Sequence, residues 1–284
     1  MKMLESPIRT GTVRPYRTRA QVSAMPGIHA ADRSLLRGIW RLADPKVSIA
    51  SFASITLGAA AAARDGSLHW EWLALTVLGI FAIEVAKNAS GEVVDFSTGA
   101  DQGVGPEDRS PFSGGKRVLV DNILTRTQTV VIAIACYLIG IAVGLAISAE
   151  RHPGVLWLGL AGIWLAYFYH APPIRLSYRG FGEIAVAAAY GPLIACGTYL
   201  VQRRDWSEAA FLASLPLGLL IAAFLWINEF PDVRADRAAG KRTLVVSLGP
   251  RAASYGYAAL AVIAYALIAI LPALGLPRSV WLGL

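Results

Sequence analysis

The chain has 284 residues, of which 55% are hydrophobic and 16% charged, with a formal net charge of +7 and a mean hydropathy of +0.51. The apolar residues come in long blocks, which excludes a soluble globular domain and indicates a chain that crosses a membrane several times. Because a basic excess in a membrane protein is first of all a topology signal, we expect no nucleic-acid partner.

The first part of the chain is polar and basic. Residues 1–46 contain nine Lys or Arg against three acidic residues, and they lack the continuous apolar run of a cleavable signal peptide. We therefore expect a basic N-terminal arm over residues 1–46 and a transmembrane domain over residues 47–284.

Seven apolar stretches follow, each close to the roughly 20 residues that a helix needs to cross a bilayer. They lie at 47–63, 70–90, 128–149, 154–170, 183–201, 209–228 and 252–275. The sequence thus predicts an all-α fold, a bundle of transmembrane helices in a lipid bilayer. Residues 277–284 read like the start of a further span, so we expect the C-terminal helices to be incomplete.

Basic residues are unevenly divided between the two sides of this bundle. When the loops are assigned alternately to the two sides, five Arg fall on one side and the other twenty-one Lys and Arg on the opposite side. Cytoplasmic loops carry such an excess. We therefore expect the N-terminus and the two long polar loops, 91–127 and 229–251, to face the cytoplasm, in the cell membrane of a bacterium or an archaeon.

Each long polar loop begins with acidic residues at the end of an apolar span. The segment 84–95 reads EVAKNASGEVVD, and the segment 228–237 reads NEFPDVRADR. Residues three or four apart share one face of a helix. Two stripes are therefore expected: Asn88, Glu92 and Asp95 form one, and Asn228, Asp232 and Asp236 form the other. The equivalent asparagines are 140 positions apart, which indicates two copies of one helical unit.

Clustered carboxylates at the edge of hydrocarbon need a compensating cation. Oxygen ligands without a nearby His or Cys favour Mg²⁺, and two facing acidic clusters suit two metal ions on one diphosphate. An alternative interpretation is a solvated loop face, in which the acids pair with Arg234, Arg237 and Lys241.

These residues resemble the UbiA superfamily of intramembrane prenyltransferases, which carries an Asn-Asp-x-x-Asp type motif after the second helix and an Asp-x-x-x-Asp motif after the sixth. Within it the chain is most similar to the 1,4-dihydroxy-2-naphthoate prenyltransferases of menaquinone synthesis. The segments that carry this likeness are DFSTGAD at 95–101, SGGKRVL at 113–119, PPIRLSYRG at 172–180 and DRAAGKRTL at 236–244.

The resemblance implies a bundle of two four-helix-type repeats that moves a polyprenyl group from its diphosphate to an aromatic acceptor, with Mg²⁺ as cofactor. The implied metal ligands are Glu92, Asp95, Asp101, Asp232 and Asp236. The candidate catalytic amides are Asn88 and Asn228. The candidate diphosphate-binding residues are Lys116, Arg117, Arg175 and Lys241.

Two departures from the family pattern bear on these expectations. Where the family usually has Asn-Asp, this chain has Gly91-Glu92, which keeps the acid but loses the amide. Asn88, one turn earlier, is a possible replacement for that amide, and whether Glu92 binds metal stays open. The family normally builds nine helices, whereas this sequence stops at the start of the eighth.

Alternatives remain for the acceptor and for the class of protein. Other acceptors in the same superfamily are 4-hydroxybenzoate, homogentisate, a chlorin and a haem. A transporter is the rival from another class, because intramembrane acids and internal repeats also mark transport paths. Glu84, inside the second span, is expected either to contact the acceptor or to make a hydrogen bond between helices.

Overall fold

The structure, a computed structural model, describes residues 34–284. Residues 1–33, most of the predicted basic arm, lie outside this part. Within residues 34–284 the chain forms helices and turns and no strand. The predicted all-α membrane bundle is thereby confirmed, and the boundary of the arm at residue 46 stays a prediction.

The helices follow one another closely along the chain. The first are α2 (Leu35–Ala43), α3 (Pro45–Asp65), α4 (Trp70–Thr98) and α5 (Arg126–Glu150). Next come α6 (Gly154–Phe168), α7 (Gly182–Ala188), the π-helical segment η4 (Ala189–Leu193), α8 (Ile194–Arg203) and α9 (Glu208–Asn228). The last are α10 (Val233–Ala238), α11 (Leu244–Leu248) and α12 (Pro250–Ile270). Short 3-10 segments lie at Pro106–Asp108, Leu176–Tyr178, Leu271–Leu274 and Arg278–Gly283.

Six helices in residues 34–284 are long and apolar enough to cross a membrane. They are α3, α4, α5, the run from α7 to α8 with its kink at Gly191, α9, and α12 with the segment after it. The seventh predicted span, 154–170, forms only the 15 residues of α6. A helix of this length rises about 22 Å, less than the roughly 30 Å of the hydrocarbon core. Pro172 and Pro173 follow it, and proline is incompatible with a continuing helix.

Helix α4 extends eight residues beyond the predicted span, to Thr98. It ends at Gly99, which takes the left-handed conformation at φ 87° and donates its N–H to the carbonyl of Asp95. Glycine adopts this conformation without steric cost, which makes it a common helix terminator. The acidic segment predicted to lie in a loop therefore belongs to the helix.

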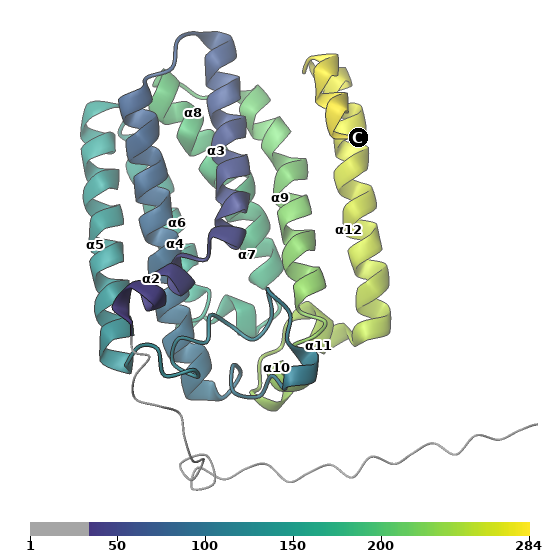
Figure 1. Cartoon of the computed structure of the whole chain (residues 1–284). Coiled ribbons are helices and arrows are strands. Elements are labelled where there is room, and N and C mark those ends of the chain that lie inside the picture. The colour runs from purple at the N-terminus through teal and green to yellow at the C-terminus, as the bar shows by residue number, and fades with distance from the viewer. Residues whose placement is uncertain (1–33) are drawn as a thin grey trace, which may run out of the picture. The chain divides into compact units, whose positions relative to one another are not determined.

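The long helices pack in pairs. Helix α4 packs along α5, α3 against α8, and α9 against α12. In Figure 1 these helices run side by side, while α10, α11 and the segment that follows α4 lie together at one end of the bundle. Both acidic segments therefore reach the same end.

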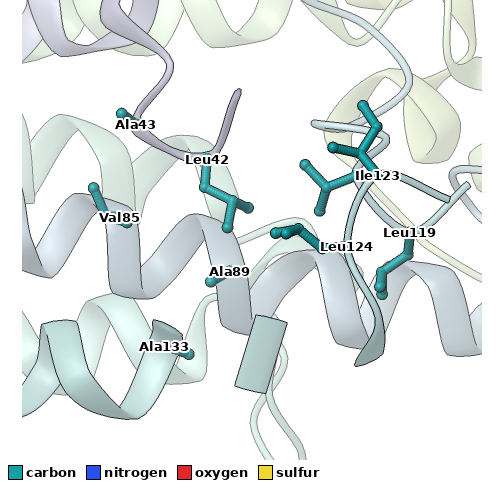
Figure 2. Packing of buried hydrophobic residues seen from close by; sticks show 9 residues of the cluster. Leu42, Ala43, Val85, Ala89, Leu119, Ile123, Leu124 and Ala133 are labelled. Atoms are coloured by element: carbon teal, nitrogen blue, oxygen red, sulfur yellow. The ribbon is translucent and has the colours of Figure 1, made fainter. Parts of the chain in front are cut away.

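The segment after α4 is fixed by a buried apolar cluster. Figure 2 shows Leu42 of the α2 end above Ala89 of α4, with Leu119, Ile123 and Leu124 beside them. Leu42 and Ala89 are fully buried. Burial of a Leu or Ile side chain stabilises a fold by about 1.5–3 kcal/mol. This cluster therefore holds residues 119–124 against the end of α4.

Candidate active site

The first acidic cluster lies at the end of α4. Asn88, Glu92 and Asp95 are all buried on this helix, as the predicted stripe requires. The amide of Asn88 donates to the carbonyl oxygen of Leu42 at 2.8 Å. Asp95 accepts a hydrogen bond from the hydroxyl of Tyr178 at 2.8 Å. The last turn of α4 thus presents polar side chains to the interior of the protein.

Asp101 lies just beyond the end of α4 and is 4% exposed. Its Oδ2 atom has no hydrogen-bond partner among the described residues. Gly115, at φ +69°, sits directly against this carboxylate, and a Cβ atom at position 115 would overlap it. Only glycine therefore fits beside Asp101.

The second acidic cluster differs from the predicted stripe. Helix α9 ends at Asn228, and residues 229–232 form turns before α10 begins at Val233. The prediction that Asn228, Asp232 and Asp236 share one continuous helix face is wrong. Pro231 explains the break, since proline has no N–H to donate and disfavours helical geometry in the residue before it.

Lys241 joins the two clusters. Its ammonium lies 3.6 Å from Asp95 Oδ2 and 3.5 Å from Asp236 Oδ1. Burial alone would lower the pKa of Lys241, but the carboxylates of Asp95 and Asp236 raise it well above its ordinary value. The Lys241 ammonium thus lies between Asp95 of the first acidic cluster and Asp236 of the second.

Two further carboxylates of the site, those of Asp101 and Asp232, are only partly compensated by positive charge and hydrogen bonds. Burial and the neighbouring Asp236 raise the pKa of Asp232, and a hydrogen bond from the Gly114 N–H lowers it, with a net value of about 7. Burial also raises the pKa of Asp101, to which the charges of Asp95 and Glu92 add. Desolvation and like charge both disfavour the ionised form, so a bound cation would be stabilised here.

A glycine-containing loop, residues 113–119, covers the acids. The carboxylate of Glu92 accepts three of its backbone N–H groups: Oε2 those of Lys116 at 3.0 Å and Arg117 at 3.1 Å, and Oε1 that of Leu119 at 3.1 Å. Asp232 Oδ2 accepts the N–H of Gly114 at 3.1 Å. Acids from both halves of the chain therefore hold this loop in place.

The predicted basic residues divide into two groups. Lys116 and Lys241 line the same cavity as the acids, and Lys116 forms an ion pair with Asp44. Arg117 and Arg175 do not line it: Arg117 pairs with Asp121 at 3.2 Å, and the Arg175 guanidinium lies 5.0 Å from the centre of the Tyr178 ring. A role for these two arginines in binding diphosphate stays a prediction.

The acids and amides surround one polar cavity of about 200 Å³. The predicted residues in its wall are Asn88, Glu92, Asp95, Asp101, Lys116, Asn228, Asp232, Asp236 and Lys241. Among residues 34–284 no three His, Cys, Asp or Glu side chains converge closely enough to hold a metal ion by themselves. The carboxylates are spread over the wall of the cavity, so a metal ion here would also need oxygen ligands from a bound anion or from water.

A second cavity, of about 380 Å³ and almost entirely apolar, lies between α4, α5, α6 and the α7 to α8 run. Four residues belong to the walls of both cavities: Lys87, Tyr169, Val186 and Tyr190. We call this shared wall the junction. A polar site thus adjoins an apolar space within the membrane bundle.

The sequence-based list of site residues left out two residues that lie against Asp95. Tyr178 lies in the PPIRLSYRG segment, but nothing in its spacing points to Asp95. His170 lies 3.6 Å from Asp95 through Nε2, and its ring fills the space where a Cβ on Gly91 would come within 2.6 Å. Burial lowers the pKa of His170 to about 4. The His170 ring explains why position 91 carries no side chain.

Glu84 makes the hydrogen bond between helices that was one of its two expected roles. It accepts from the hydroxyl of Ser51 on α3 and from that of Tyr190 on η4, the latter at 2.9 Å. Its second oxygen, Oε2, has no partner among the described residues. Glu84 thereby ties α4 to two other helices just beside the junction.

Comparison with known proteins agrees with this geometry. The UbiA prenyltransferase family matches residues 52–284. The chain is 26% identical over 227 residues to the 1,4-dihydroxy-2-naphthoate octaprenyltransferase of Bacillus subtilis, covering 80% of this chain and 71% of that protein. It is 30% identical over 222 residues to the 2-carboxy-1,4-naphthoquinone phytyltransferase of Synechocystis, covering 77% and 68% of the two.

A solved structure shows the same fold. It is a UbiA homologue from Archaeoglobus fulgidus bound to GPP and Mg²⁺, with a TM-score of 0.65 and 18% sequence identity. The match covers 86% of this chain and 81% of that one. The family match spans most of the chain and includes both acidic clusters, the whole apolar cavity and all but two residues of the wall of the polar cavity. The chain belongs to the UbiA prenyltransferase family.

Proposed function

We propose that this protein transfers a polyprenyl group from its diphosphate to 1,4-dihydroxy-2-naphthoate, with Mg²⁺ bound among its acidic residues. The observation that carries the proposal is the junction, where a polar cavity lined by carboxylates meets an apolar cavity inside the membrane bundle. A prenyl diphosphate has the same two parts, a charged head and an apolar chain.

The donor set of the polar cavity fits Mg²⁺. Asp101 Oδ2 and Asp232 Oδ1 are buried without hydrogen-bond partners in the described part of the chain, and both are hard oxygen ligands. We assign the metal-holding role to Asp95, Asp101, Asp232 and Asp236. Bound Mg²⁺ would neutralise the charge that develops on the leaving diphosphate. Glu92, whose oxygens accept three backbone N–H groups, stays an open candidate for a further ligand.

Lys116 and Lys241 supply positive charge at the walls of the polar cavity. Each ammonium is held inside the protein by a carboxylate, so it is already charged and in place. Each can then bind the phosphate oxygens of a diphosphate. Asn88 and Asn228 line the same cavity, and we assign their amides to orienting the diphosphate head.

The apolar cavity suits the prenyl chain. It adjoins the polar cavity at Tyr169 and Tyr190, so a head held by the acids would place the first carbon of the chain at the junction. Aromatic faces stabilise a developing allylic cation, and the apolar wall excludes the water that would capture it. The acceptor must reach the same place to react.

The relatives support the choice of acceptor. The proteins from Bacillus subtilis and Synechocystis are named for naphthoate and naphthoquinone substrates. We extend this to the present chain, and we place the polar cavity on the cytoplasmic side because twenty-one of the 26 basic residues fall on the side of the acidic loops.

Incubation of membranes carrying the protein with labelled geranylgeranyl diphosphate and a panel of acceptors tests the proposal. The panel contains 1,4-dihydroxy-2-naphthoate, 4-hydroxybenzoate and homogentisate. We expect labelled product with the naphthoate and little with the other two. Preferred labelling of 4-hydroxybenzoate or homogentisate would overturn the choice of acceptor, and labelling of none would overturn the transferase activity itself.

A further inference from the structure

Lys87 is a partly buried cation that forms no ion pair within 4.0 Å in residues 34–284, although the carboxylates of Glu84, Asp44 and Asp95 act on it from a greater distance. It lies on α4 in the wall of both cavities. Among residues 34–284 its ammonium has no hydrogen-bond partner and no carboxylate oxygen within 4.0 Å. Its ammonium lies over the Tyr169 ring, whose centre is 5.3 Å away. A cation in such a place is stabilised when an anion binds beside it.

The position of Lys87 separates it from the metal-holding acids. Lys87 and Asp95 are eight positions apart on α4, a rise of about 12 Å. Lys87 also lines the apolar cavity, which Asp95 does not reach. It contacts the ring of Tyr169, which follows the end of α6. Lys87 is thus set back from the place assigned to the diphosphate.

The other lysines of the site are engaged with carboxylates. Lys116 pairs with Asp44, and Lys241 lies between Asp95 and Asp236. In the proposed function these two lysines and the bound metal ions neutralise the charge of the diphosphate. Lys87 is therefore available to bind a second anion at the junction, one carried by the acceptor.

We propose that Lys87 binds a carboxylate on the aromatic acceptor and so selects carboxylated acceptors over neutral ones. This inference rests on the proposed function, and it adds the residue that recognises the acceptor. With the carboxylate against the ammonium, the acceptor ring lies next to Tyr169 and Tyr190, where the first carbon of the prenyl chain is expected. An acceptor without the carboxylate would leave Lys87 unpaired.

The test compares two acceptors that differ only in the carboxylate, 1,4-dihydroxy-2-naphthoate and 1,4-naphthalenediol, with geranylgeranyl diphosphate as donor. kcat/KM for each acceptor is measured with purified full-length wild type, Lys87→Met and Lys87→Arg. We expect wild type to prefer the carboxylated acceptor by about 10–100-fold, the range for a charge-assisted hydrogen bond. Lys87→Met should reduce this ratio to near one, and Lys87→Arg should retain most of it.

Two controls separate this role from others. The KM for geranylgeranyl diphosphate should rise in Lys116→Met and change little in Lys87→Met, and a thermal melt reports whether each variant is folded. An unchanged ratio between the two acceptors in Lys87→Met, or a rise in its donor KM, would overturn the assignment. If wild type prenylates neither acceptor, the proposed function itself fails, an outcome distinct from an active enzyme with an unchanged ratio.

Discussion

The carboxylate of Glu92 accepts the backbone N–H of Leu119 at 3.1 Å, across 27 positions of sequence. Two more N–H groups of the same loop point at its other oxygen. Glu92 thereby positions the loop that carries Lys116 and covers Asp101. This contact distinguishes two roles for Glu92, as a metal ligand and as a support for the loop.

The first prediction concerns these two roles. In Glu92→Gln one oxygen becomes an NH₂ group that faces a backbone N–H, an arrangement that costs about 1–3 kcal/mol. We expect a lower Tm and a higher KM for prenyl diphosphate, with little change in the Mg²⁺ concentration for half activity. Asp95→Asn serves as the comparison and should raise that concentration. If Glu92→Gln raises it equally, Glu92 is a ligand.

The second prediction concerns the fit of Gly115 against Asp101. Gly115→Ala places a methyl group in the space of the Asp101 carboxylate and forces an L residue to φ +69°. We expect kcat/KM to fall by about 10–100-fold, the effect of displacing a reacting group by about 1 Å. Gly275→Ala is the matched control, because Gly275 has φ +92° with nothing within 4 Å of its Cβ position. Equal losses in both variants would show that backbone strain alone is responsible.

The third prediction concerns the pH dependence of stability at Glu229. Burial and, after it, the nearby Glu183 raise the pKa of Glu229 to about 10. The folded protein therefore holds this proton while the unfolded chain releases it above its ordinary value of 4.5, so stability falls as pH rises toward the folded pKa.

Glu229→Gln carries no titrating group at this position, so its Tm should fall less than that of wild type between about pH 6 and about pH 9. We expect a difference of at least about 4 °C, since 1 kcal/mol shifts Tm by about 2–4 °C in a chain of this size. Glu208→Gln, at the exposed start of α9, is the control. Parallel pH curves for wild type and Glu229→Gln would contradict the prediction.

The fourth prediction concerns topology. Gln102 is exposed in the segment after α4, close to the acids. In Gln102→Cys we expect no labelling by an impermeant thiol reagent applied outside intact cells, and labelling after the membrane is opened. The wild-type chain, whose Cys136 and Cys196 lie within membrane helices, gives the background. Labelling from outside would reverse the proposed orientation.

Much of this arrangement follows from local sequence. The hydropathy of the sequence predicted the six membrane-spanning helices, because the apolar content of a segment decides whether it enters the bilayer. It missed residues 91–98 of α4, which are helical but less apolar. It also missed the break at Pro231, because the spacing of Asn228, Asp232 and Asp236 fits a helix as well as it fits turns.

The partners of the site residues were beyond such reasoning. Tyr178 and Lys241 approach Asp95 only after distant segments fold together. Glu92 meets backbone N–H groups, which have no sequence signature at all. The junction likewise depends on how α4, α6 and η4 pack, so nothing in the sequence alone singled out Lys87.

Mg²⁺-dependent transfer by wild type and Asp236→Ala tests most directly whether the acids of the polar cavity hold the metal. The purified full-length proteins are incubated with labelled geranylgeranyl diphosphate and 1,4-dihydroxy-2-naphthoate, in Mg²⁺ or in chelator, and prenylated product and released pyrophosphate are measured beside a thermal melt. We expect wild type to be active only with Mg²⁺. Asp236→Ala should fold but lose at least about 100-fold in turnover, as when a group that stabilises developing charge is removed. Near wild-type turnover in Asp236→Ala, or transfer by wild type in chelator, would contradict the assignment.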